Sequence, residues 1–113
     1  MIAAGLPIYL ALEPVDMRMG FERLGGLVRD KMQMEPRSRA LFVFVGKSGH
    51  SMKILTWDGT GVLLINKRLD IGRFDLPVAT SFDQQHVVVS DALFGAIFAG
   101  NGTRRNKRKR TIN

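Results

Sequence analysis

Five consecutive apolar residues, Leu41-Phe42-Val43-Phe44-Val45, constrain the fold of this 113-residue chain more than any other segment. Successive side chains of a strand point to opposite faces of a sheet, so an unbroken run of apolar residues has to be covered on both sides. The run therefore predicts a central strand with other elements packed above and below it. A chain of this length can supply those elements within one domain.

The rest of the chain predicts further strands and two helices around that strand. Apolar residues at helical spacing follow Asp16, a potential N-cap, and Glu35-Pro36 ends that helix; Ser90 is the potential N-cap of a second helix that ends at Gly100. Asp58-Gly59 is a strong hairpin signal. The predicted strands are 8–12, 41–45, 52–57, 62–65, 73–76 and 85–89. The predicted core centres on Phe21, Phe42, Phe44, Ile54 and Leu64. These features predict an α+β fold, a mostly antiparallel β-meander packed with two helices.

Charge is unevenly distributed along the chain. Residues 37–73 carry seven Lys and Arg against two Asp, and residues 74–102 carry three Asp and no base. The segment 103–113 holds six bases and no acid, while residues 1–36 are close to neutral, so most of the net charge of +7 lies in that last segment. We therefore expect one α+β domain over residues 1–102 and a disordered basic tail over residues 103–113.

Several classes of function are disfavoured by composition. The chain has no cysteine and two histidines, which excludes disulfides, thiolate metal sites and cysteine nucleophiles. No run of residues approaches the roughly 18 apolar positions that span a bilayer. We accordingly expect a cytoplasmic protein with no membrane association and no bound metal or cofactor.

Two groups of residues carry a family resemblance. The first is the run VDMRMGF at 15–21, followed by Leu24 and Leu27. The second is longer and comprises LFVF at 41–44, KIL at 53–55, WDGTG at 57–61, KRL at 67–69 and GRF at 72–74. In order and spacing, across residues 8–77, these pieces resemble the small TnpB-type accessory proteins of the insertion sequence 66 family. The helix after Ser90 is a weaker third match.

The resemblance implies a bacterial protein that assists the transposition of an insertion sequence beside a separate companion transposase. It implies no catalytic residues. A carboxylate cluster for two-metal chemistry could form only from distant residues, and most of the ten acids are explained as caps, turns or solvated helix positions. The segment Gly46-Lys47-Ser48-Gly49 lacks the full pattern of a phosphate-binding loop. We therefore expect that the protein is not an enzyme.

Two basic regions are candidates for nucleic-acid binding. The tail attracts phosphates without reading sequence, although it could also serve only to keep the protein soluble. Bases also surround the predicted hairpin, where Lys53, Leu55 and Trp57 share one face, and an aromatic ring beside bases can stack on unpaired nucleotides. Alternatively, Trp57 packs in the core and the lysines extend to water. The predicted contact residues are Lys53, Trp57, Lys67, Arg68, Arg73, Arg104, Arg105, Lys107, Arg108, Lys109 and Arg110.

Two functions follow from these features. The first is a non-catalytic accessory of transposition and DNA recombination that contacts DNA through the hairpin face and the tail. The second is a protein–protein adaptor that docks on the transposase and has no specific nucleic-acid site. The sequence leaves the oligomeric state open.

Overall fold

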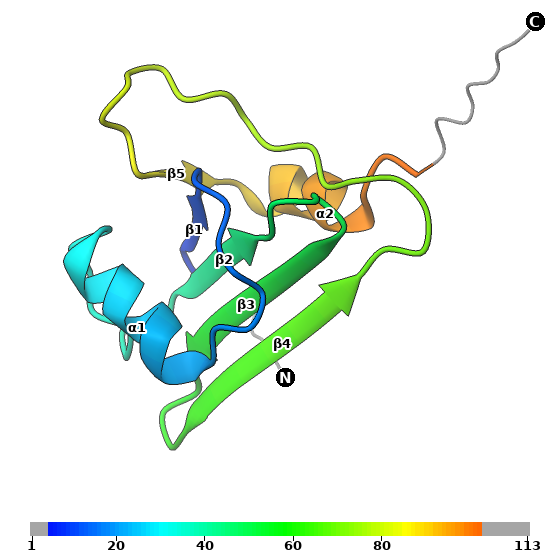
Figure 1. Ribbon diagram of the computed structural model, residues 1–113. Helices are drawn as coiled ribbons and strands as arrows, with labels where there is room; N and C mark the ends of the chain where they lie inside the picture. The colour runs from blue at the N-terminus through cyan, green and yellow to red at the C-terminus, as the bar shows by residue number, and fades with distance from the viewer. Residues whose placement is uncertain (1–4, 103–113) are drawn as a thin grey trace, which may run out of the picture.

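A computed structural model describes residues 5–102 and contains one five-stranded sheet and two helices (Figure 1). The predicted α+β class is therefore confirmed, as is the predominance of antiparallel pairing. Between residues 5 and 102, no helix is both long enough and apolar enough to cross a membrane. In chain order the elements are β1 (Ile8–Ala11), α1 (Phe21–Asp30), β2 (Leu41–Val45), β3 (Ser51–Trp57), β4 (Val62–Arg68), β5 (His86–Val89) and α2 (Asp91–Ala99).

The sheet has the strand order β4-β3-β2-β1-β5, which places β2 at its centre. The strands β2, β3 and β4 form the predicted antiparallel meander, whereas β1 runs parallel to β2 and α1 connects the two. A parallel pair needs such a crossover connection, because a short turn cannot return the chain to the starting edge. The strand β5 then pairs antiparallel with the free edge of β1.

Every residue of β2 is buried, as its unbroken apolar run predicts. Phe42 and Phe44 pack with Leu24 of α1 on one face of the sheet, which we call the α1 face. Val43 packs with Ile97 of α2 on the opposite face, which we call the α2 face. The two helices thus shield the central strand from water on both sides.

The Asp58-Gly59 turn and the Ser90 helix cap form as the sequence predicts. In the β3–β4 hairpin, Asp58 Oδ1 accepts hydrogen bonds from the backbone N–H groups of Thr60 and Gly61, both at 2.9 Å, and these bonds lower the pKa of the Asp58 carboxyl. Gly59 takes a φ of 103°, a conformation that favours glycine. At the start of α2, the Ser90 hydroxyl accepts a hydrogen bond from the Leu93 N–H at 3.1 Å and caps the helix as predicted.

The predicted start of the first helix is wrong. The helix α1 begins at Phe21 with Gly20 as its N-cap, and Asp16 does not cap it. Instead, the Asp16 carboxylate accepts a hydrogen bond from the Arg18 backbone N–H and forms an ion pair with the Arg18 guanidinium at 2.7 Å. These contacts hold the pKa of Asp16 well below its usual range. A local turn, which satisfies the carboxylate within two residues, therefore replaces the first predicted helical turn.

Two further predictions about packing are wrong and one is partly right. Phe21 is 54% exposed at the first position of α1 and does not belong to the core. The segment 73–76 pairs with no strand, although Phe74 is buried on the α2 face and its N–H donates to the Gly49 carbonyl at 2.8 Å. Leu64 is half-buried and packs against the α1-face cluster.

Phe44 provides a test of this core, because its side chain is 1% exposed in the central strand. We expect Phe44→Ala to lower the free energy of unfolding by roughly 3–5 kcal/mol, since it removes a buried ring and leaves a cavity. The measurement is a denaturant melt of the variant and the parent chain. Phe21→Ala is the control and should change stability by less than about 1 kcal/mol, because surface substitutions have small effects. A loss below about 1 kcal/mol for Phe44→Ala would contradict the central position of β2.

Candidate nucleic-acid interface

The hairpin residues singled out from the sequence are divided between the two faces of the sheet. Lys53, Leu55 and Trp57 are every second residue of β3, so their side chains lie on the same face of the sheet. This is the α1 face, because Leu55 belongs to the buried cluster there. Arg68 pairs with Ser51 and projects on that same face. Lys67 pairs with Met52 of the α2-face cluster and therefore lies on the other side of the sheet. A single flat ligand cannot cover all of these residues at once.

Lys53 forms a hydrogen bond to the segment that precedes α1. Its Nζ donates a hydrogen bond to the Met19 carbonyl oxygen at 2.8 Å, and the bond is partly buried. Met19 lies just before α1, so this bond ties the start of the helix to the sheet. Trp57 is half-buried at the other end of β3, beside its pairing partner Val62. The structure thus gives Lys53 a structural contact.

Lys67 contacts the C-terminal end of α2. Its Nζ donates to the Phe98 carbonyl oxygen at 2.7 Å and lies 3.8 Å from the centre of the Phe98 ring. Phe98 is in the last turn of α2, where carbonyl groups lack helical partners and the helix dipole favours a cation. Both contacts hold α2 against the sheet.

Arg68 and Arg73 are exposed and lie near the β2–β3 turn. Arg68 donates a long hydrogen bond of 3.3 Å to the Ser51 hydroxyl. The Arg73 side chain lies against Gly49, whose positive φ and lack of a Cβ leave room for it. Lys47 is exposed in that same turn. We call these three cations, Lys47, Arg68 and Arg73, the basic end of the sheet.

The last described residues, Asn101 and Gly102, contact the segment that carries Arg73 of the basic end. The Arg73 N–H donates to Asn101 Oδ1 at 2.7 Å, and the Asn101 N–H donates to the Arg73 carbonyl at 2.9 Å. Asn101 Nδ2 also donates to Asp75 Oδ1 at 2.7 Å. Gly102 packs so closely on this segment that a Cβ on Gly72 would overlap the Gly102 backbone, and a Cβ on Gly102 would overlap the Ile71 carbonyl. The described part of the chain therefore ends, at Gly102, beside the basic end of the sheet.

The predicted contacts in the tail, Arg104, Arg105, Lys107, Arg108, Lys109 and Arg110, lie outside the described residues. Within the described part, two exposed carboxylates, Asp70 and Asp75, belong to the segment that carries Arg73. They offset part of the charge of the basic end. Asp75 is held by its hydrogen bond from Asn101.

The described residues offer few other chemical centres. No group of three or more carboxylates and histidines within residues 5–102 is arranged to hold a metal ion. His50 Nδ1 lies 2.7 Å from the Gly72 carbonyl oxygen, so the ring is engaged with backbone. The Ser48 hydroxyl accepts a hydrogen bond from the His50 backbone N–H at 3.2 Å and has no such contact with the imidazole. This arrangement belongs to a loop rather than to a nucleophile paired with a base.

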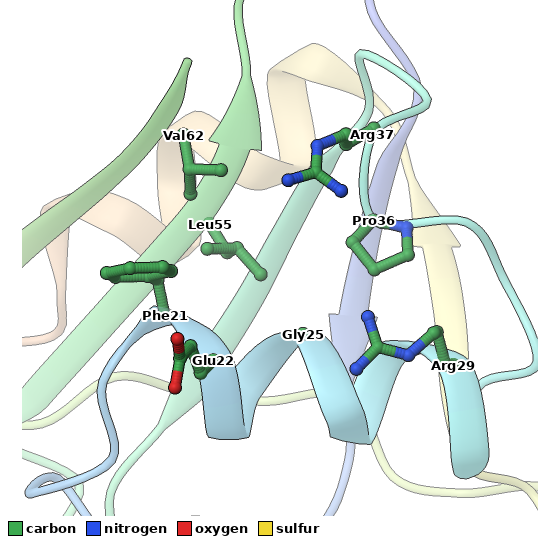
Figure 2. A pocket seen from close by; sticks show the side chains of 8 residues that line it. All are labelled: Phe21, Glu22, Gly25, Arg29, Pro36, Arg37, Leu55 and Val62. Carbon is green, nitrogen blue, oxygen red and sulfur yellow. The ribbon is translucent and has the colours of Figure 1, made fainter.

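A pocket beside α1 was not foreseen from the sequence. It has a volume of about 420 Å³ and lies between α1, the β3–β4 hairpin and Pro36 (Figure 2). Leu55 and Val62 contribute apolar surface, and Arg29 and Arg37 contribute guanidinium groups. These residues come from four separate segments, so spacing along the chain gives no signal of the pocket.

Comparison with known proteins identifies the family. The sequence model of the family described as "IS66 Orf2 like protein" matches residues 6–108. The chain therefore belongs to the IS66 Orf2-like family. Membership implies an accessory role in insertion-sequence transposition, in association with a transposase.

Two curated relatives come from Sinorhizobium fredii. The protein y4hO is 42% identical over 72 residues, which cover 64% of this chain and 63% of the relative. The protein y4jC is 33% identical over 105 residues, which cover 93% of this chain and 87% of the relative. The match to y4hO thus spans less than two thirds of that protein's length. No solved structure matches the chain.

The contacts of Lys67 lead to a stability prediction. We expect Lys67→Ala to lower the free energy of unfolding by about 1–2 kcal/mol, because a charged hydrogen bond and a cation–π contact are lost together. Arg68→Ala, next in the strand, should change it by less than about 0.5 kcal/mol, since the hydrogen bond that its side chain forms within residues 5–102 is long and exposed. Thermal and denaturant melts measure both. Equal effects of the two substitutions would contradict the role assigned to Lys67.

Proposed function

We propose that this protein is a non-catalytic accessory of transposition that binds DNA through the basic end of its sheet and the adjoining segment 103–113. The observation that supports the proposal is the attachment of Asn101 to Arg73, because the second basic region of the sequence begins only a few residues after Asn101. One duplex could then meet Lys47, Arg68 and Arg73 together with the cations that follow Gly102. We assign residues 1–102 to one domain and place the protein in the cytoplasm, where the bacterial chromosome is accessible.

Phosphate contacts supply affinity and orient the protein, whereas discrimination between DNA sites needs a surface of defined shape. The segment 103–113 consists mainly of Lys and Arg, so in this proposal it provides attraction without sequence reading. The basic end is attached to strands and a fixed turn, so it provides orientation. Trp57 and Lys53 stay among the proposed contacts as secondary ones, because Trp57 is half-buried and Lys53 is bonded to Met19.

The first test compares the full chain with a chain that ends at Gly102. If all six tail cations meet duplex phosphates, truncation should make the slope of log affinity against log salt shallower by at most about 5, from ~0.9 per contact. Arg68→Glu combined with Arg73→Glu should also make it shallower, by about 2. Fluorescence anisotropy with labelled element-end duplexes and single strands, over a range of salt, gives these slopes.

Arg23→Glu combined with Lys31→Glu is the matched control, because it makes an equal charge change at exposed positions at the two ends of α1. We expect this control to affect affinity much less than the change at the basic end. We also expect only the basic-end variant to alter the preference among element ends or between duplex and single strands. If that variant bound like the parent while truncation abolished binding, the basic end would have no role and the adaptor function would be favoured.

The proposal also predicts an absence of cleavage. Incubated with element-end DNA and magnesium, manganese or zinc, the purified protein should neither cut nor join strands, because two-metal chemistry needs converging carboxylates. Denaturing gel electrophoresis of end-labelled DNA detects either reaction. Metal-dependent cleavage that disappears on a single Asp→Asn substitution would show that the protein is an enzyme.

A further inference from the structure

The pocket beside α1 is divided into an apolar half and a cationic half. Figure 2 shows Phe21 and Val62 at one end of the pocket, and Leu55 lies next to them on the side toward Pro36. At the other end the guanidinium groups of Arg29 and Arg37 point into the pocket from either side of Pro36. Phe21 and Val62 are exposed, at 54% and 40%, although both are large apolar side chains.

The two arginines of the pocket are available to a ligand. Neither forms an ion pair with a carboxylate within residues 5–102, where the one salt bridge joins Arg18 and Asp16. Glu22 lies at the Phe21 end of the pocket. The pocket therefore suits a ligand with an apolar group for the Phe21 end and a carboxylate, next to it, for the two guanidinium groups. A phosphate at the Phe21 end would be repelled by the negative charge of the Glu22 carboxylate.

The same chain presents that combination elsewhere. Between Pro77 and β5, a long loop extends away from the body of the molecule (Figure 1). Phe82 in this loop is fully exposed, at 103%, and the exposed Asp83 follows it directly. Several hydrogen bonds shape the tip of the loop, among them one from the Thr80 N–H to Gln84 Oε1 at 2.7 Å and one from the Ser81 hydroxyl to Asp83 Oδ1 at 2.8 Å. The Asp83 carboxylate is exposed, and Asp83 lines a shallow surface pocket together with Lys31 of its own chain.

We propose that the pocket beside α1 binds the Phe82–Asp83 loop of a second copy of this chain. The Phe82 ring enters the apolar half between Phe21 and Val62, and the Asp83 carboxylate meets Arg29 and Arg37. Each copy has one loop and one pocket, so two copies that exchange loops form a closed two-fold dimer, whereas a one-way contact would continue into a filament.

The charge pattern of the sequence supports attraction between copies. Residues 74–102, which contain the loop, carry three acids and no base, and the pocket lining carries two arginines against one glutamate. Burial of the fully exposed Phe82 ring in the apolar half of the pocket removes apolar surface from water and adds to this attraction. Dimerisation through this pocket is a separate property from DNA binding at the basic end.

The first measurement is sedimentation equilibrium of the full chain over a wide range of concentrations. We expect a concentration-dependent dimer that is lost in three variants, Phe82→Ser, Asp83→Arg and Arg37→Asp. Leu93→Ser and Arg23→Asp are matched controls, since both change exposed side chains that do not line the pocket, and they should leave the dimer intact. A monomer at every concentration, or a dimer that persists in all three variants, would overturn the proposal.

A mixing experiment tests the exchange itself. Alone, Asp83→Arg brings a cation to a cationic pocket, and Arg37→Asp brings two carboxylates together, so neither variant should dimerise. An equal mixture of the two restores opposite charges at both contacts and should form a heterodimer. Failure of the mixture to associate, when each variant has the circular dichroism spectrum of the parent, would contradict reciprocal exchange.

A peptide separates this occupant from a nucleic acid. Fluorescein-labelled LPVATSFDQQH, residues 76–86, should bind the Phe82→Ser protein, whose pocket is free, and should lose at least about tenfold in affinity when Arg37→Asp is added. The peptide with serine in place of Phe82 is the control and should not bind. Displacement of the peptide by oligothymidine in an Arg37-dependent manner would instead assign the pocket to nucleic acid and overturn the proposal.

Discussion

Burial of β2 on both faces is the constraint on which the rest of this structure depends. Phe42 and Phe44 need apolar cover on one side, and Leu41, Val43 and Val45 need it on the other. Each such side chain gains about 1.5–3 kcal/mol when it leaves water, so a five-residue strand of this kind can organise a small domain. The helix α1 covers one face, and α2 with the segment around Phe74 covers the other. Removal of either layer would expose the strand.

The two lysines of the hairpin show how this constraint affects the surface. Lys53 and Lys67 lie on opposite faces of the sheet, and each donates to a carbonyl next to the helix that covers its face, Met19 before α1 and Phe98 in α2. They therefore help to hold the two helical layers onto the sheet. The predicted hairpin bases that stay exposed, Arg68 and Arg73, lie together with Lys47 at one end of the sheet. There Arg73 is bonded through its backbone to Asn101, so the position from which the basic segment continues is set by the fold.

The proposed functions use different parts of the molecule. The basic end lies at the β2–β3 turn, whereas the pocket with Arg29 and Arg37 lies beside α1 and is also lined by Val62, at the start of β4. Val62 pairs with Trp57 at the end of β3 that is distant from that turn. A protein of the IS66 Orf2-like family with this arrangement could hold DNA at one end and a second copy at the other.

Local chemistry determined much of the fold from the sequence alone. The apolar run 41–45, the Asp58-Gly59 turn and the Ser90 cap each act within a few residues, so their outcomes could be predicted. The family could also be recognised, because its motifs are ordered along the chain.

The sequence misled where two local solutions compete, as at Asp16, whose carboxylate binds Arg18 instead of capping a helix. Only the tertiary structure decided that β1 lies between β2 and β5, that Lys53 and Lys67 are bonded to carbonyls, and that Arg29 and Arg37 share a pocket. The physical reason is that these contacts join residues distant in sequence, and the balance of burial and pairing that selects them exists only once the sheet has formed.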